Sequence, residues 1–68
     1  MSVTNTYTVT GMTCGHCVSS VTEELTGVEG VTGVDVQLDS GAVTVTSTRE
    51  LSRDEVGTAV AEAGYQLA

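Results

Sequence analysis

The sequence has only two cationic side chains, Arg49 and Arg53, and no lysine, against nine Asp and Glu residues. The formal net charge is therefore −7 at pH 7. Proteins that bind nucleic acids or anionic membrane surfaces depend largely on Lys and Arg to do so. The composition excludes a nucleic-acid-binding surface and argues against attachment to an anionic membrane.

Long apolar runs are missing as well. No segment approaches the roughly 20 apolar residues that a membrane-spanning helix needs, and residues 1–6 lack the basic start and apolar stretch of a secretory signal. We therefore expect a cytoplasmic protein with no direct membrane insertion. The 68 residues suffice for one small domain, residues 1–68, whose thin core argues against an enzyme that encloses a large substrate.

Cysteine is scarce: only Cys14 and Cys17 are present. Small secreted domains that depend on disulfides have more cysteines, spread more widely. A bridge between these two would close a very short loop and constrain the unfolded chain little. Two cysteines also cannot complete a four-ligand zinc site within one chain. The pair is therefore predicted to bind metal or to undergo redox chemistry.

Alternating side chains predict the strands. Over residues 3–10 the threonines occupy one face, and the other face carries Val3, Tyr7 and Val9 together with Asn5. Residues 31–39 and 43–45 alternate in the same way around the turn signal Asp39-Ser40-Gly41, which predicts a hairpin. In its first strand we expect three residues to face inward: Val34, Val36 and Leu38.

Helical spacing predicts two helices. The first is expected from His16, with Gly27 and Gly30 ending it and an apolar stripe of Val18, Val21, Leu25 and Val28. The second is announced by a capping box of Ser52 and Glu55 and by a hydrophobic staple of Leu51 and Val56. Its apolar stripe comprises Val56, Ala59, Val60 and Ala63, Gly64 ends it, and residues 65–68 are expected to form a final short strand.

The expected order is strand, helix, strand, strand, helix, strand, so that each half is one βαβ unit. Two such units form an α+β ferredoxin-like βαββαβ sandwich, in which two helices cover one face of a four-stranded antiparallel sheet. The threonines of the first strand suit the open face of such a sheet.

The segment Gly11-Met12-Thr13-Cys14-Gly15-His16-Cys17 joins the first expected strand to the first expected helix. Two thiolates at such a junction can converge on one ion, and soft thiolate ligands select Cu(I) or Zn(II) over Mg²⁺ or Ca²⁺. Cu(I) tolerates the low coordination number that two cysteines offer. Because Cys17 is expected in the first helical turn, where the helix dipole lowers the pKa of a thiol, we predict that at least one thiol is ionised near neutral pH.

This motif, in this element order and chain length, resembles the metal-binding motif of the heavy-metal-associated domain family. The resemblance covers essentially all 68 residues and, within the family, is to the small bacterial copper chaperones. It implies that Cys14 and Cys17 bind one Cu(I) and that the protein hands the ion to the matching C-x-x-C of a copper-exporting P-type ATPase. No substrate is chemically changed, so we do not expect an enzyme.

Four further residues match positions around the family's metal site. Met12 matches a buried methionine and is expected to pack under the loop rather than to ligate. Tyr65 matches a loop residue near the metal and could equally be a core aromatic. His16 is expected to be a solvated residue that tunes the thiol pKa, with a third-ligand role left open. Thr13 stands where zinc-transporting relatives often have an acidic residue, which favours Cu(I), with Zn(II), Ag(I) or Hg(II) as substitutes.

Two other functions stay open. The chain could be the N-terminal regulatory domain of such an ATPase, although the Met1 start and the end just after the last strand favour a complete chain. A thiol-disulfide oxidoreductase is the other alternative, but the sequence has no proline for the cis-proline that thioredoxins place beside their C-x-x-C. We expect a monomer without metal, and a homodimer in which four thiolates share copper stays open. The lack of lysine leaves open the charge polarity of partner docking.

Overall fold

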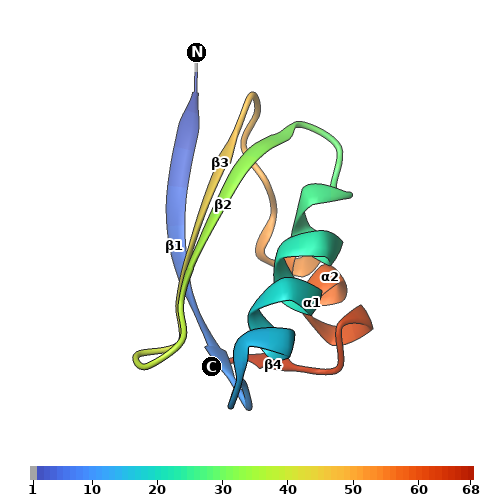
Figure 1. Ribbon diagram of the computed structural model, residues 1–68. Helices are drawn as coiled ribbons and strands as arrows, with labels where there is room; N and C mark the ends of the chain where they lie inside the picture. The colour runs from blue at the N-terminus through green and yellow to red at the C-terminus, as the bar shows by residue number, and fades with distance from the viewer. Residues whose placement is uncertain (1) are drawn as a thin grey trace.

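The computed structural model describes residues 2–68 and contains the six expected elements in the expected order. The elements are β1 (Val3–Thr10), α1 (Gly15–Thr26), β2 (Val31–Gln37), β3 (Ala42–Ser47), α2 (Arg53–Glu62) and β4 (Gln66–Leu67). The strands form one antiparallel sheet in the order β2-β3-β1-β4. Both helices lie on the same side of that sheet (Figure 1). The ferredoxin-like sandwich predicted from the sequence is therefore confirmed.

The core fills the space between the helices and the sheet. The central strand β3 contributes Val43 and Val45, which are fully buried, as the alternation of the hairpin predicts. The remaining buried members of the core come from β1, both helices and the loop before α2: Val9, Val21, Leu25, Leu51, Val56, Ala59 and Val60. The opposite face of the sheet carries the exposed threonines of β1, where the Thr6 and Thr44 hydroxyl oxygens lie 3.1 Å apart. Within residues 2–68, neither helix is both long and apolar enough to cross a bilayer.

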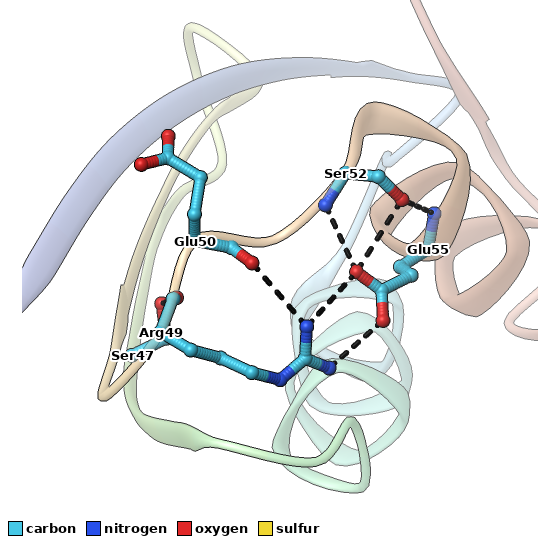
Figure 2. Close-up of polar contacts among 5 residues, drawn as sticks. All are labelled: Ser47, Arg49, Glu50, Ser52 and Glu55. Carbon is cyan, nitrogen blue, oxygen red and sulfur yellow. Dashed lines mark hydrogen bonds and ion pairs between the residues drawn. The ribbon is translucent and has the colours of Figure 1, made fainter.

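The predicted capping box begins α2. Ser52 Oγ accepts a hydrogen bond from the Glu55 amide at 3.1 Å, and Glu55 Oε2 accepts one from the Ser52 amide at 2.9 Å. Arg49, to which the sequence assigned no structural role, reaches the same carboxylate, with Nη2 2.8 Å from Glu55 Oε1 (Figure 2). The Arg49 guanidinium, and after it the Ser52 amide, lowers the pKa of Glu55 to about 2. Because β3 ends opposite Val3, this ion pair lies at the far end of the sheet from the cysteines.

The structure corrects the prediction for Leu38. The strand β2 ends at Gln37, two residues before the expected end at residue 39, and Leu38 is 38% exposed rather than turned inward. The reason is the turn that follows: the Gly41 amide donates a hydrogen bond to the Gln37 carbonyl at 2.9 Å, so that the chain leaves the strand before Leu38.

Both ends of α1 also differ in detail from the prediction. The helix begins at Gly15, and its buried positions are Cys17, Val21 and Leu25, whereas Val18 is only half-buried. Gly27 caps the other end in a right-handed conformation with φ −76°. Gly30, three residues further on, has φ +92°, and its carbonyl accepts a hydrogen bond from the amide of Thr48, the residue directly after β3. Finally, β4 is limited to Gln66–Leu67, two residues of the four expected.

Candidate metal centre

The loop between β1 and α1 places both cysteines at the start of α1. Gly11 opens the loop with φ +94°, a conformation that other L-residues adopt at a cost of about 1–2 kcal/mol. A Cβ at this position would also lie 3.3 Å from Cδ1 of the Tyr65 ring. Cys14 is the N-cap residue of α1, and its carbonyl accepts hydrogen bonds from the amides of Cys17 at 3.1 Å and Val18 at 3.3 Å. Cys17 therefore lies in the first helical turn, as the sequence predicts.

The two thiols converge. Cys14 Sγ lies 3.5 Å from Cys17 Sγ, and both cysteines are free thiols. Since a thiolate–metal bond is about 2.3 Å long in zinc sites, both sulfurs can contact a single ion placed between them. The two ligands differ in their surroundings: Cys14 is exposed, whereas Cys17 is 7% exposed and lies on the buried face of α1. The arrangement provides one anchored sulfur and one at the surface.

Hydrogen bonding stabilises the thiolate form of Cys17. The Thr13 amide lies 3.4 Å from Cys17 Sγ and the Thr13 hydroxyl 3.9 Å from it. The Thr13 amide, followed by the Tyr65 hydroxyl, lowers the pKa of Cys17 to about 6, against an opposing effect of burial. This value agrees with the predicted ionisation of a thiol near neutral pH. Its main cause, however, is the Thr13 amide, whereas the sequence suggested the helix dipole.

The other predicted site residues lie around this pair. Met12 is half-buried and packs against the core, which is the supporting position that the sequence favours. Tyr65 packs against the core as well, and its interaction with Cys17 raises the pKa of the phenol; its role beside a bound metal stays a prediction. His16 is exposed. Within residues 2–68, no three His, Cys, Asp or Glu side chains lie close enough together to hold one ion, so His16 does not join the two cysteines here.

Two contributions to this site escaped sequence reasoning. One is the Thr13 amide, because the sequence drew attention only to the side chain of Thr13. The other is Gly41, which the sequence marks only as a turn residue. Its carbonyl accepts a hydrogen bond from the Val9 amide at 2.8 Å, and a Cβ on Gly41 would lie 2.6 Å from the Val9 carbonyl oxygen. The hairpin turn is thus held against β1 just before the cysteine loop, a contact between segments about 30 residues apart for which the sequence carries no local signal.

Comparison with known proteins places this geometry in a family. The family model of the heavy-metal-associated domain matches residues 6–66. The copper chaperone CopZ of Staphylococcus aureus is 37% identical over 60 residues, which cover 87% of this chain and 88% of that protein.

Comparison with solved structures leads to the same family. A CopZ metallochaperone superposes with a TM-score of 0.89 at 33% identity, over 97% of this chain and 100% of the other. A copper-binding domain from HMA7, a P-type ATPase, superposes with a TM-score of 0.87 at 28% identity, over 100% of this chain and 92% of the other. The family match, the identity over most of the chain and the shared fold, together with the C-x-x-C pair at the start of α1, show that this chain belongs to the heavy-metal-associated domain family.

Proposed function

We propose that this protein is a cytoplasmic carrier that binds one Cu(I) between Cys14 and Cys17 and delivers it to the metal-binding domain of a copper-transporting P-type ATPase. The observation that carries the proposal is the convergence of the two free thiols, with their sulfurs 3.5 Å apart. The curated relative of similar length, a copper chaperone, supports the carrier role. The similarity to a copper-binding domain of a P-type ATPase supports a partner with the same fold.

The donor set favours Cu(I). Thiolates are soft ligands, and two of them satisfy an ion that accepts low coordination, whereas a structural zinc site takes four ligands. The low pKa of Cys17 supplies one ligand already ionised near neutral pH. Silver and mercury ions share the preference for thiolates and are the substitutes we expect, with Zn(II) held more weakly.

The difference in exposure between the two cysteines suggests how the ion leaves. Two thiolate bonds of about 2.3 Å in a straight line would separate the sulfurs by about 4.6 Å, more than the 3.5 Å found here. Cys14 is the exposed ligand and can move outward to reach that geometry, while the Thr13 amide holds Cys17 in place. An incoming thiolate of the partner replaces Cys14 first, and Cys17 releases the ion last. Since no covalent bond of a substrate changes, the protein acts as a carrier and not as an enzyme.

An anaerobic titration with Cu(I) against a chromophoric chelator, run beside Zn(II), tests the proposal. Wild type is compared with Cys14→Ser and Cys17→Ser, and His16→Ala serves as the matched control inside the same loop. We expect tight one-to-one binding of Cu(I) that both cysteine variants lose and His16→Ala keeps. Tight Zn(II) binding that depends on His16, with weak Cu(I) binding, would overturn the choice of metal.

A second candidate function is that of a regulatory metal-binding domain of an ATPase, favoured by the structural likeness to the HMA7 domain. The two roles differ in the direction of copper transfer: a carrier gives copper to the metal-binding domain of an ATPase, whereas such a domain receives it. Mixing the Cu(I)-loaded protein with a separately purified ATPase metal-binding domain, followed by chromatographic separation, measures how copper partitions. Delivery to that domain supports the carrier.

A redox function would give a different set of results. Failure of both tight metal binding and copper delivery, together with reduction of insulin by the protein, would assign the cysteine pair to thiol–disulfide exchange.

A further inference from the structure

The edge of β1 is open over the first half of the strand. On one side, β3 pairs with β1 from Val3 to Thr8. On the other side, β4 pairs only with Val9 and Thr10, and the Ala68 amide adds one hydrogen bond to the Thr8 carbonyl at 2.9 Å. Within residues 2–68, no strand covers Val3–Tyr7 on the side of β4, and β1 extends well past β4 in Figure 1.

The strand register identifies the backbone groups that face this open edge. In an antiparallel strand, the amide and carbonyl of one residue point to one side and those of the next residue to the other. The Val9 amide donates to the Gly41 carbonyl on the side of β3, and the Thr8 carbonyl accepts from Ala68 on the side of β4. The amides and carbonyls of Thr4 and Thr6 therefore point away from β3, in the plane of the sheet, and form the open edge.

This edge lacks the usual protection. Natural edge strands are commonly shielded by a charged side chain, a proline or a bulge. Residues 2–10 contain no charged residue and no proline, and consist mainly of Val and Thr, which favour strands. All nine Asp and Glu residues lie between residues 23 and 62. The open edge of β1 therefore lies in a segment that carries none of the charges of this acidic chain.

Asn5 is the second, independent feature of the edge. It is a polar residue in the inward row of β1, between Val3 and Tyr7, and is half-buried. Within residues 2–68, its side-chain amide forms no hydrogen bond to another residue. An amide carries both donors and an acceptor, so that two asparagines facing each other across a two-fold axis satisfy one another. In coiled coils, a single asparagine in the apolar seam specifies the register and the number of chains that associate.

We propose that a second copy of this chain pairs with the open edge, β1 antiparallel to β1, with the two-fold axis at Asn5. In this register Thr4 of one copy faces Thr6 of the other, so the amide and carbonyl of each find a partner. The two Asn5 amides meet on the helix side. On the other side the threonine rows of the two copies continue one another, in the way that Thr6 and Thr44 already pair within the sheet.

The two-fold geometry separates this dimer from one bridged by copper. Because the two β1 strands run in opposite directions, the cysteine loops lie at opposite ends of the joined sheet and stay accessible. The dimer needs neither metal nor thiols, although the sequence alone predicts a monomer without metal. Each copy carries a net charge of −7, so the copies repel one another and added salt strengthens the association by screening.

Sedimentation equilibrium of the reduced, metal-free protein from micromolar to millimolar concentration tests the proposal. We expect the mass to rise from 6.9 kDa towards twice that value, at lower concentration when salt is added. Thr6→Pro removes an amide hydrogen-bond donor from the open edge of β1. Asn5→Asp brings two negative charges together across the proposed two-fold axis. Each should remain folded by circular dichroism and stay at the monomer mass over the same range. The matched control is Thr44→Lys, which adds a charge to the open face of β3 away from the edge and should still dimerise.

Three results would overturn the proposal. One is a mass of 6.9 kDa for the wild type at every concentration. The second is a dimer that survives both Thr6→Pro and Asn5→Asp. The third is a dimer that disappears in the variant Cys14→Ser, which would place the contact at the cysteine loop. If Thr6→Pro does not fold, Asn5→Asp carries the test, because it leaves every backbone hydrogen bond of the sheet in place.

Discussion

The backbone amide of Thr13 donates a hydrogen bond to Cys17 Sγ over 3.4 Å, and Cys14 lies between these two residues in the chain. The loop thus folds back on the first turn of α1 and holds one sulfur while leaving the other at the surface. Since a hydrogen bond to a charged group favours the charged form, the same contact sets the chemical state of the anchored sulfur. The site is therefore asymmetric before any ion arrives.

Cys17 is expected to ionise well below the ordinary pKa of a thiol. In the variant Cys14→Ser, which leaves Cys17 as the only thiol, we expect a midpoint near the value of about 6 that the Thr13 amide and the Tyr65 hydroxyl produce. The measurement is the thiolate absorbance as a function of pH, checked by the rate of alkylation. A midpoint near the ordinary ~8.5 would contradict this account. At Cys17, protons should compete with the metal mainly below about pH 6, because the thiolate is the ligand.

The hydroxyl of Tyr65 should contribute measurably to the lowered pKa of Cys17. Tyr65→Phe keeps the ring that packs against the core and removes only the group that interacts with Cys17. We expect the midpoint of Cys17 to rise, as measured by the same titration in the Cys14→Ser background. Tyr7→Phe is the matched control, because Tyr7 also packs against the core but does not contribute to the pKa of Cys17. An equal shift in both variants would mean that general loosening of the core, not the hydroxyl, is responsible.

Gly41 and Gly64 should differ in their tolerance of alanine. Both have positive φ, +75° and +96°, so each substitution introduces backbone strain of about 1–2 kcal/mol. At Gly64 a Cβ would meet nothing within 4 Å, whereas at Gly41 it would lie 2.6 Å from the Val9 carbonyl oxygen. We therefore expect Gly41→Ala to lower the free energy of unfolding distinctly more than Gly64→Ala in urea denaturation. An equal loss of unfolding free energy in the two variants would show that the hairpin turn can move away from β1 without destabilising the protein.

Acid should weaken the fold through Glu55. Arg49 lowers the pKa of this carboxyl to about 2 in the folded protein, below the value of about 4.3 expected for an unfolded glutamate. The unfolded state then binds more protons, so the stabilisation is complete above about pH 4.3 and is lost as the pH falls towards 2. Thermal melting between pH 7 and pH 2 should show this loss, and the variant Glu55→Gln should show less of it. If thermal stability depended on pH in the same way in wild type and in Glu55→Gln, Glu55 would not be the cause of the loss in acid.

Much of the fold follows from local sequence patterns. The alternation of β1 and β3, the stripe of α2 and the capping box of Ser52 and Glu55 all appear in the structure as predicted. These features depend on residues two to four positions apart, whose relation is set by the geometry of one strand or one helical turn. The C-x-x-C pair belongs to the same class, because one helical turn is enough to bring its two sulfurs together.

Contacts between distant segments decided the rest. Burial of Cys17 rather than Val18 depends on how α1 rotates against the sheet, and the turn that exposes Leu38 is held against β1 by the hydrogen bond from the Val9 amide to the Gly41 carbonyl. The approach of Tyr65 to Cys17 brings together residues 48 positions apart in the sequence. Periodicity identifies which face of an element is apolar, but not which neighbour that face meets. The packing of the elements therefore settles which thiol is anchored, and it adds the Tyr65 hydroxyl to the local Thr13 amide that lowers the pKa of Cys17.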